Sequence, residues 1–118
     1  MADTISWSLQ LAVQDGQLEA ARALMTEMVE ATRQEAGAIG YEWFISADGS
    51  AVHINEKYAD SAATLEHLGN FGANFAERFL TCFAPTAFYV YGDPSEEVRG
   101  VLDGFGAVYL GALGGFAR

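Results

Sequence analysis

The fold of this chain is decided by one stretch: Ile39-Gly-Tyr-Glu-Trp-Phe-Ile-Ser-Ala47, then Asp48-Gly49, then Ser50-Ala-Val-His-Ile-Asn-Glu-Lys-Tyr58. Two runs rich in β-branched and aromatic residues flank Asp-Gly, a dipeptide that readily adopts the positive φ angles of a two-residue turn. We therefore predict a β-hairpin in which Ala47 lies opposite Ser50.

The register of this hairpin places two sets of side chains on opposite faces of a sheet. One face pairs Ile45 with Val52, Trp43 with Ile54, Tyr41 with Glu56, and Ile39 with Tyr58. The other face pairs Phe44 with His53, Glu42 with Asn55, and Gly40 with Lys57. The first face is apolar except for Glu56, and a carboxylate on a core face costs free energy unless it is paired or solvated.

Composition bounds the class of protein. A chain of 118 residues with 51% hydrophobic residues has room for one domain, and its apolar excess hints at an interface between subunits. The formal charge of −10 argues against binding to nucleic acid or to an anionic membrane surface. No secretion signal or membrane-spanning run is recognisable, and Cys82 is alone, so we expect a cytoplasmic protein.

Periodicity predicts a strand over 4–13 and a helix from Leu18 to about Ala36, capped by Asp15 and ended by Gly37. After the hairpin, Asp60 or Ser61 can cap a short helix that ends at Gly69. Further elements are predicted in this order: a helical piece from Asn70, a strand over 86–91, a helix begun by Asp93-Pro94-Ser95-Glu96 and ended by Gly104, and a strand over 105–110.

This order of elements predicts an α+β, ferredoxin-like fold with a split βαβ pattern, in which helices cover one face of an antiparallel sheet. The other face would be bare in a monomer. We therefore expect a homodimer that covers this open face with a second copy of the chain.

A family resemblance rests on Gly40-Tyr41, Ile54, Glu56, Tyr58, Asp60 and His67. Their order resembles that of the antibiotic biosynthesis monooxygenase-like family, within the dimeric α+β barrel superfamily. The resemblance covers a core of about residues 4–92 in one domain of 1–118, and makes 93–118 a C-terminal extension that lengthens the sheet or embraces the partner. It implies kinship with cofactor-free oxygenases that form quinones from anthrone- or quinol-type substrates, with haem-degrading oxygenases, and with members of unknown role.

The haem-degrading branch of the family fits the sequence poorly. Its members place a tryptophan where this chain has His67, and a haem-ligating histidine ten residues later, where this chain has Glu77. A glutamate would not ligate haem iron as a histidine does. The asparagine that those members carry in the first strand also has no counterpart, so we do not expect haem degradation.

Glu56 and His67 are the candidate catalytic residues, with Tyr58 beside them. Aromatic surroundings could raise the pKa of Glu56 and make it a general base, or Glu56 could form a structural ion pair with Lys57 of another strand or with an arginine of the partner. His67 could shuttle a proton at the Tyr58 end of the pocket, or cap its own helix before Gly69. Strand parity turns His53 away from Glu56.

The aromatic residues around this acid suit a pocket for a flat, apolar ligand, although most such side chains serve a core. The predicted lining residues are Trp7, Tyr41, Trp43, Ile54, Phe75 and Phe79. Two histidines and one cysteine without ligand spacing predict no metal site, and no cofactor motif is present.

The resemblance implies a cofactor-independent monooxygenase in which Glu56 or His67 takes a proton from a small aromatic substrate that then reacts with O2. Tyr41, Tyr58 and Trp43 would hold the ring of the substrate. One alternative is a small-molecule-binding or accessory dimer without turnover. The other is a structural dimer whose pocket is filled by its own side chains.

Overall fold

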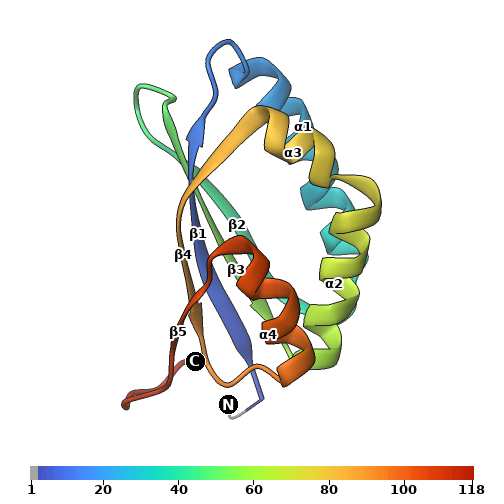
Figure 1. Ribbon diagram of the computed structural model, residues 1–118, viewed down its shortest axis with the longest axis vertical. Helices are drawn as coiled ribbons and strands as arrows, with labels where there is room; N and C mark the ends of the chain where they lie inside the picture. Colours follow the sequence, from blue (N-terminus) through green and yellow to red (C-terminus); the bar gives the residue numbers. More distant parts are fainter. Residues whose placement is uncertain (1–2) are drawn as a thin grey trace.

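Five strands form one sheet, and the helices cover one face of it, in the computed structural model, which describes residues 3–118 (Figure 1). This is the predicted α+β arrangement, and within one chain the sheet does not close into a barrel. The elements are, in order, β1 Ile5–Val13, α1 Leu18–Arg33, β2 Ala38–Ile45, β3 Ala51–Tyr58, α2 Ser61–Asn74, α3 Ala76–Cys82, β4 Phe83–Tyr91, α4 Glu96–Leu102, the 3₁₀ turn η1 Asp103–Phe105, and β5 Val108–Leu110.

The strands lie in the order β2-β3-β1-β4-β5, and all neighbours are antiparallel except β4 and β5. The predicted hairpin register is confirmed from Tyr41, opposite Glu56, to Ile45, opposite Val52. It is wrong at the far end of the hairpin. A β-bulge there leaves Ile39 without a partner and 56% exposed, so Ala38 lies opposite Tyr58 instead.

The predicted boundaries of the first two helices need three corrections. Helix α1 ends at Arg33 rather than Ala36, and Gln17, not Asp15, occupies its N-cap position. Helix α2 runs through Gly69 and breaks only at Phe75, because a glycine costs a helix interior about 1 kcal/mol and does not end it by itself. His67 therefore lies inside a continuous helix.

Two caps show how short polar side chains set the helix starts. The predicted cap at Asp60 is confirmed, since its carboxylate accepts a hydrogen bond of 2.8 Å from the backbone N–H of Ala63. Helix α4 begins after Ser95 rather than Asp93, because the Ser95 hydroxyl accepts from the N–H of Val98.

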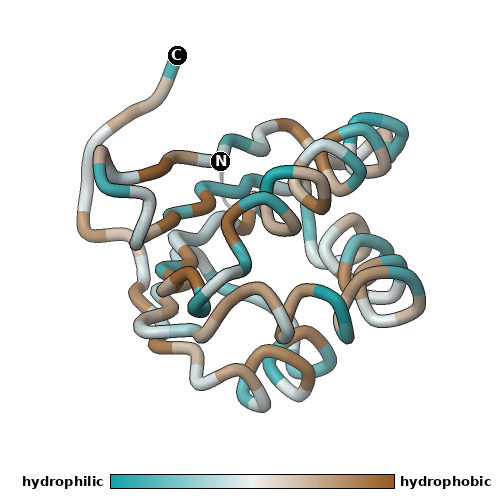
Figure 2. The backbone as a smooth tube through the Cα atoms, turned by 90° about the horizontal axis from the view of Figure 1, so that it is seen from above, coloured by the Kyte–Doolittle hydropathy of each residue, from teal (hydrophilic) through white to brown (hydrophobic). Residues whose placement is uncertain are grey.

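The C-terminal extension lengthens the sheet, because β5 pairs in parallel with β4. Helix α4 and η1 return to the helical face, where Val98 and Leu102 are fully buried. Seen from above, the last residues of the chain extend away from the body of the molecule (Figure 2). No helix within residues 3–118 is long and apolar enough to cross a membrane.

The turn between α1 and β2 lies directly against α2, and Gly37 permits this approach. A Cβ atom at Gly37 would overlap the Cβ of Ala63. The carbonyl of Gly37 also accepts a hydrogen bond of 2.9 Å from the N–H of Ala59. This close approach brings the end of α1 next to the middle of α2, where the candidate site lies.

Replacing Gly37 with alanine is expected to lower the free energy of unfolding by about 1–3 kcal/mol, because the added methyl group overpacks the contact with α2. Urea unfolding measures the change. The same substitution in an Ala63→Gly background is the control, since that background removes the opposing methyl group. An equal cost in both backgrounds would contradict this explanation.

Candidate functional site

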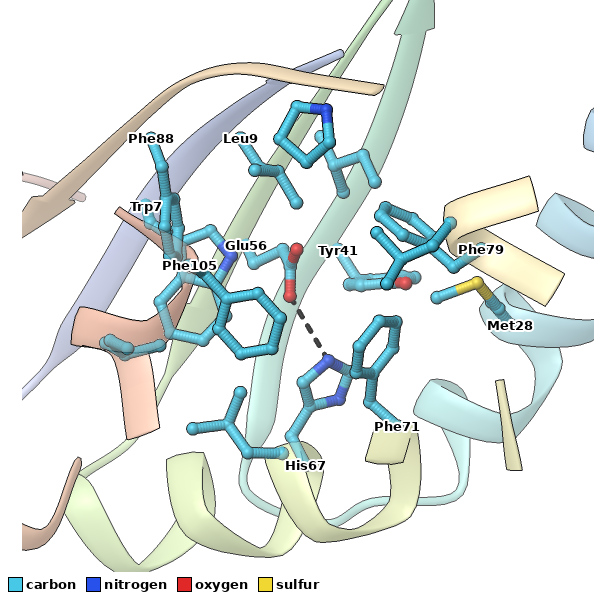
Figure 3. Close-up of a pocket in the computed structure, with 15 residues that line it drawn as sticks. Trp7, Leu9, Met28, Tyr41, Glu56, His67, Phe71, Phe79, Phe88 and Phe105 are labelled. Carbon is cyan, nitrogen blue, oxygen red and sulfur yellow. Dashed lines mark ion pairs between the residues drawn. The ribbon is translucent and has the colours of Figure 1, made fainter. Parts of the chain in front are cut away.

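A pocket lies between the sheet, helices α2 and α3, and the α4–η1 segment (Figure 3). Its lining side chains leave about 50 Å³ of free space, so a ring-sized ligand would require them to move apart. The exposed side chains of Leu80, Pro85 and Phe105 line its outer part. The full lining consists of Trp7, Leu9, Met28, Tyr41, Ile54, Glu56, His67, Leu68, Phe71, Phe79, Leu80, Pro85, Phe88, Leu102 and Phe105.

Glu56 projects from β3 into this pocket and is only 6% exposed. Its Oε1 atom accepts a hydrogen bond of 2.6 Å from the hydroxyl of Tyr58 and lies 3.3 Å from Nε2 of His67. Within residues 3–118, Oε2 has no hydrogen-bond partner, and Figure 3 shows this second oxygen directed away from His67. One carboxylate oxygen is therefore held by the protein, and the other is available to a ligand.

His67 lies between two buried carboxylates. Its Nε2 faces Glu56, and its Nδ1 lies 2.9 Å from Oε1 of Glu35, which is 8% exposed. The side chain of Asn70 donates a bond of 3.2 Å to the other Glu35 oxygen. Burial alone would lower the pKa of His67, but the bonds and charges of Glu56 and Glu35 outweigh burial and raise it. When the ring is protonated, both of its nitrogens donate to carboxylates.

Glu35 is the residue that sequence reasoning missed. It follows the last turn of α1, where its backbone N–H donates to the carbonyl of Thr32. A helix C-terminus favours cations over anions. A glutamate at this place, two residues before a glycine, therefore indicates from the sequence that its carboxylate has a partner elsewhere in the fold. Its partner His67 is 32 residues away, a separation that no local pattern reveals.

Tyr58 and Tyr41 surround the acid and stay neutral. Burial is the main cause that raises the pKa of each phenol, and the charge of Glu56 adds to it. Tyr58 is fully buried behind Glu56, and its ring centre lies 4.8 Å from that of His67. Tyr41 lines the pocket itself, with its ring centre 5.7 Å from that of His67.

The structure brings together most of the predicted site residues. Trp7, Tyr41, Ile54 and Phe79 line the pocket with Glu56 and His67. Tyr58 contacts Glu56 from behind and is not part of the lining. Two predicted lining residues lie elsewhere: Trp43 borders a second hollow, and Phe75 packs against the core at the break between α2 and α3.

The contacts of Glu56 and His67 differ from the structural roles predicted as alternatives for these two residues. The ion pair of Glu56 is formed with His67 of the same chain, while Lys57 lines a hollow on the opposite face of the sheet. His67 lies inside α2, so it does not cap a helix end before Gly69. His53 is exposed and lies opposite Phe44, away from the pocket.

The cluster of Glu35, His67 and Glu56 does not form a metal centre. The two carboxylates flank opposite nitrogens of a single ring, so the three groups do not converge on one point. No group of three or more histidine, cysteine, aspartate or glutamate side chains in residues 3–118 could hold a metal ion.

The raised pKa of His67 predicts a pH dependence of stability. Because the folded chain holds this proton more tightly than the unfolded chain does, the stabilisation is complete below the ordinary pKa of about 6.5. It is lost as the pH rises through the folded-state pKa. Urea unfolding at a series of pH values above 6.5 should therefore show a falling free energy of unfolding.

In Glu35→Gln, which lacks one of the two carboxylates that raise the pKa of His67, this fall should be smaller and should end at a lower pH. Glu66→Ala is the control, because the exposed Glu66, next to His67 on α2, should leave the wild-type dependence unchanged. A free energy of unfolding that stays constant, or rises, over this range in the wild type would contradict the assignment.

The chain belongs to the antibiotic biosynthesis monooxygenase family, whose model matches residues 5–79. Among solved structures it is similar to MupZ from Pseudomonas fluorescens, with 24% identity, a TM-score of 0.87, and coverage of 100% of this chain and 91% of MupZ. Rv0793 from Mycobacterium tuberculosis is 28% identical, with a TM-score of 0.59 and coverage of 79% of this chain and 97% of Rv0793.

SnoaB from Streptomyces nogalater, a cofactor-independent oxygenase, shares the fold at 11% identity, with a TM-score of 0.67 and coverage of 80% of this chain and 96% of SnoaB. No curated protein sequence matches the chain. The likeness to MupZ extends over the C-terminal segment as well, whereas those to Rv0793 and SnoaB cover about four fifths of the chain.

Proposed function

We propose that this protein is a cofactor-independent monooxygenase that oxidises a small aromatic substrate of the quinol or anthrone type with O2. Membership of the monooxygenase family and the fold shared with SnoaB support the reaction class. The observation that carries the proposal is the single free carboxylate oxygen of Glu56 in an otherwise apolar, aromatic pocket.

Glu56 acts as the general base in this mechanism. Its Oε2 takes a proton from the substrate, while Tyr58 and His67 hold Oε1 and fix the orientation of the carboxylate. When Glu56 becomes neutral, the protonated His67 keeps Glu35 as its counter-ion.

The anion left on the substrate then reacts directly with O2. Electrons pass from the substrate anion to oxygen, the two recombine to a peroxide, and the peroxide takes back the proton from Glu56. One oxygen atom remains in the product as a new carbonyl and the other leaves as water. Anthrone and O2 give anthraquinone and water in this way, and 1-naphthol and O2 give 1,4-naphthoquinone and water.

The test is oxygen uptake by purified, chelator-treated protein with anthrones and naphthohydroquinones or naphthols as substrates. Uptake above the rate of autoxidation, with one atom of ¹⁸O₂ in the quinone formed from anthrone, supports the proposal. Saturable binding of these compounds without uptake would instead favour the alternative, a small-molecule-binding protein without turnover.

We also propose that the chain acts as a cytoplasmic homodimer, paired through the face of the sheet that the helices leave bare. That face carries the exposed side chains of Phe44, Tyr89, Tyr91, Val108 and Leu110. Apolar groups on an uncovered sheet face are typical of an interface. Sedimentation equilibrium measures the state directly, and a monomer at micromolar concentration would contradict it.

A further inference from the structure

Trp7 is an unexplained residue at this site. Its indole ring is 4% exposed and lines the pocket from β1, packed against Tyr58 and Phe88 with ring centres 5.1 and 5.6 Å away. The indole Nε1 is buried without a hydrogen-bond partner. A buried donor left unpaired costs about 1–3 kcal/mol, so such a group calls for a partner that the free chain does not supply.

The position of this donor indicates what the partner is. Trp7 lies directly opposite Glu56 on the neighbouring strand, so the two side chains stand side by side on the same face of the sheet. Figure 3 shows the indole nitrogen on the side of the ring that faces Glu56. An unpaired donor and a free carboxylate oxygen thus occur together at the floor of one apolar pocket.

A single functional group of a ligand can bond to the indole N–H and to the carboxylate oxygen at the same time. A hydroxyl on an aromatic ring can donate its hydrogen to Glu56 Oε2 while its oxygen accepts from the indole N–H. An anthrone, by contrast, would need a base at its methylene carbon and a donor at its carbonyl oxygen, and these two atoms lie on opposite sides of a ring. A single oxygen atom suits two side chains on directly opposed residues better.

We propose that Trp7 Nε1 and Glu56 Oε2 together bind the hydroxyl of a flat phenol or naphthol. This inference rests on the proposed function and adds to it a preference for phenolic compounds over anthrones. When Glu56 takes the hydroxyl proton, the indole N–H remains bonded to the oxygen on which negative charge develops, as a donor in an oxyanion site does. The pocket then selects for the hydroxyl as well as for the flat ring.

Three probes of similar shape separate the two contacts by calorimetric titration without O2. The first, 1-naphthol, can donate and accept; 1-methoxynaphthalene can only accept; naphthalene can do neither. We expect 1-naphthol to bind most tightly and naphthalene most weakly. Trp7→Phe should weaken binding of 1-naphthol about tenfold and leave naphthalene within about twofold, because only the hydrogen bond is lost.

Trp43→Phe is the matched control. The Nε1 of Trp43 is also buried without a partner, but its ring borders the second hollow. This variant should bind 1-naphthol within about twofold of the wild type. Equal affinity of the wild type for 1-naphthol and naphthalene, or an equal loss in both tryptophan variants, would overturn the inference, as would failure of 1-naphthol to bind.

A direct readout uses the two indole N–H resonances of the ¹⁵N-labelled wild-type protein, one for each tryptophan. The resonance that Trp7→Phe removes should move downfield with 1-naphthol and stay in place with naphthalene. An unmoved Trp7 resonance at saturation would overturn the inference even if the variants fold poorly. Because these experiments measure binding and not turnover, a failure of this inference can be distinguished from a failure of the proposed function.

Discussion

Glu56→Gln is expected to lower kcat by about 10² to 10⁴, the usual contribution of a general base. Glutamine keeps the shape of the side chain, and its oxygen can still accept from Tyr58 and His67, but it has no carboxylate to take the proton. The fold should be retained, while the affinity for a phenol should fall, because the amide nitrogen takes the place of Oε2 and cannot accept from the hydroxyl of the ligand. Oxygen uptake measures the loss of kcat, and thermal unfolding of the same preparation measures whether the fold is retained.

Glu42→Gln is the matched control, because Glu42 lies on β2 with its exposed side chain on the opposite face of the sheet. It should retain wild-type kcat. Activity in Glu56→Gln within threefold of the wild type would remove Glu56 from the mechanism, whatever the effect of the other substitutions.

His67→Ala is expected to have the largest effect on stability, a loss of about 3–5 kcal/mol, because it leaves two buried carboxylates without their shared cation. Glu66→Ala, at an exposed position next to His67 on α2, should stay within about 0.5 kcal/mol of the wild type. Urea unfolding at pH 6.5 measures both.

The cause of this loss can be separated from the loss of packing. If the unpaired charges are responsible, adding Glu35→Gln to His67→Ala should recover part of the stability, since it removes one of the two carboxylates. In the wild-type background the same Glu35→Gln substitution should destabilise. A cost below about 1 kcal/mol for His67→Ala, or no recovery in the double variant, would contradict the ionic account of the cluster.

The sequence predicted the architecture well because the signals for it are local. The register between Tyr41 and Ile45 on one strand and Val52 and Glu56 on the other is as predicted. That register is enough to place Glu56 on the core face of the sheet. The turn itself differs from the predicted two-residue one, because only Gly49 has a positive φ angle and the strands end at Ile45 and begin at Ala51. The error at Ile39 came from a bulge next to the tight contact at Gly37, where tertiary packing overrides alternation.

The site was predicted less completely, because its decisive contacts are not local. Glu56 and His67 could be identified from their positions, but their link depends on Glu35, which reaches His67 only because α2 packs against the turn after α1. Gly69 was expected to end the helix, which would have placed His67 at a helix end rather than inside α2. The roles of Leu102 and Phe105 in closing the pocket likewise depend on how the extension folds back.

The measurement that tests the central claim most directly is exchange of the methylene hydrogens of anthrone for deuterium in ²H₂O without oxygen. It isolates proton removal from every later step. The account predicts exchange that is faster with the wild-type protein than in buffer, and that returns to the buffer rate in Glu56→Gln while Glu42→Gln exchanges normally. Exchange in Glu56→Gln as fast as in the wild type would contradict it.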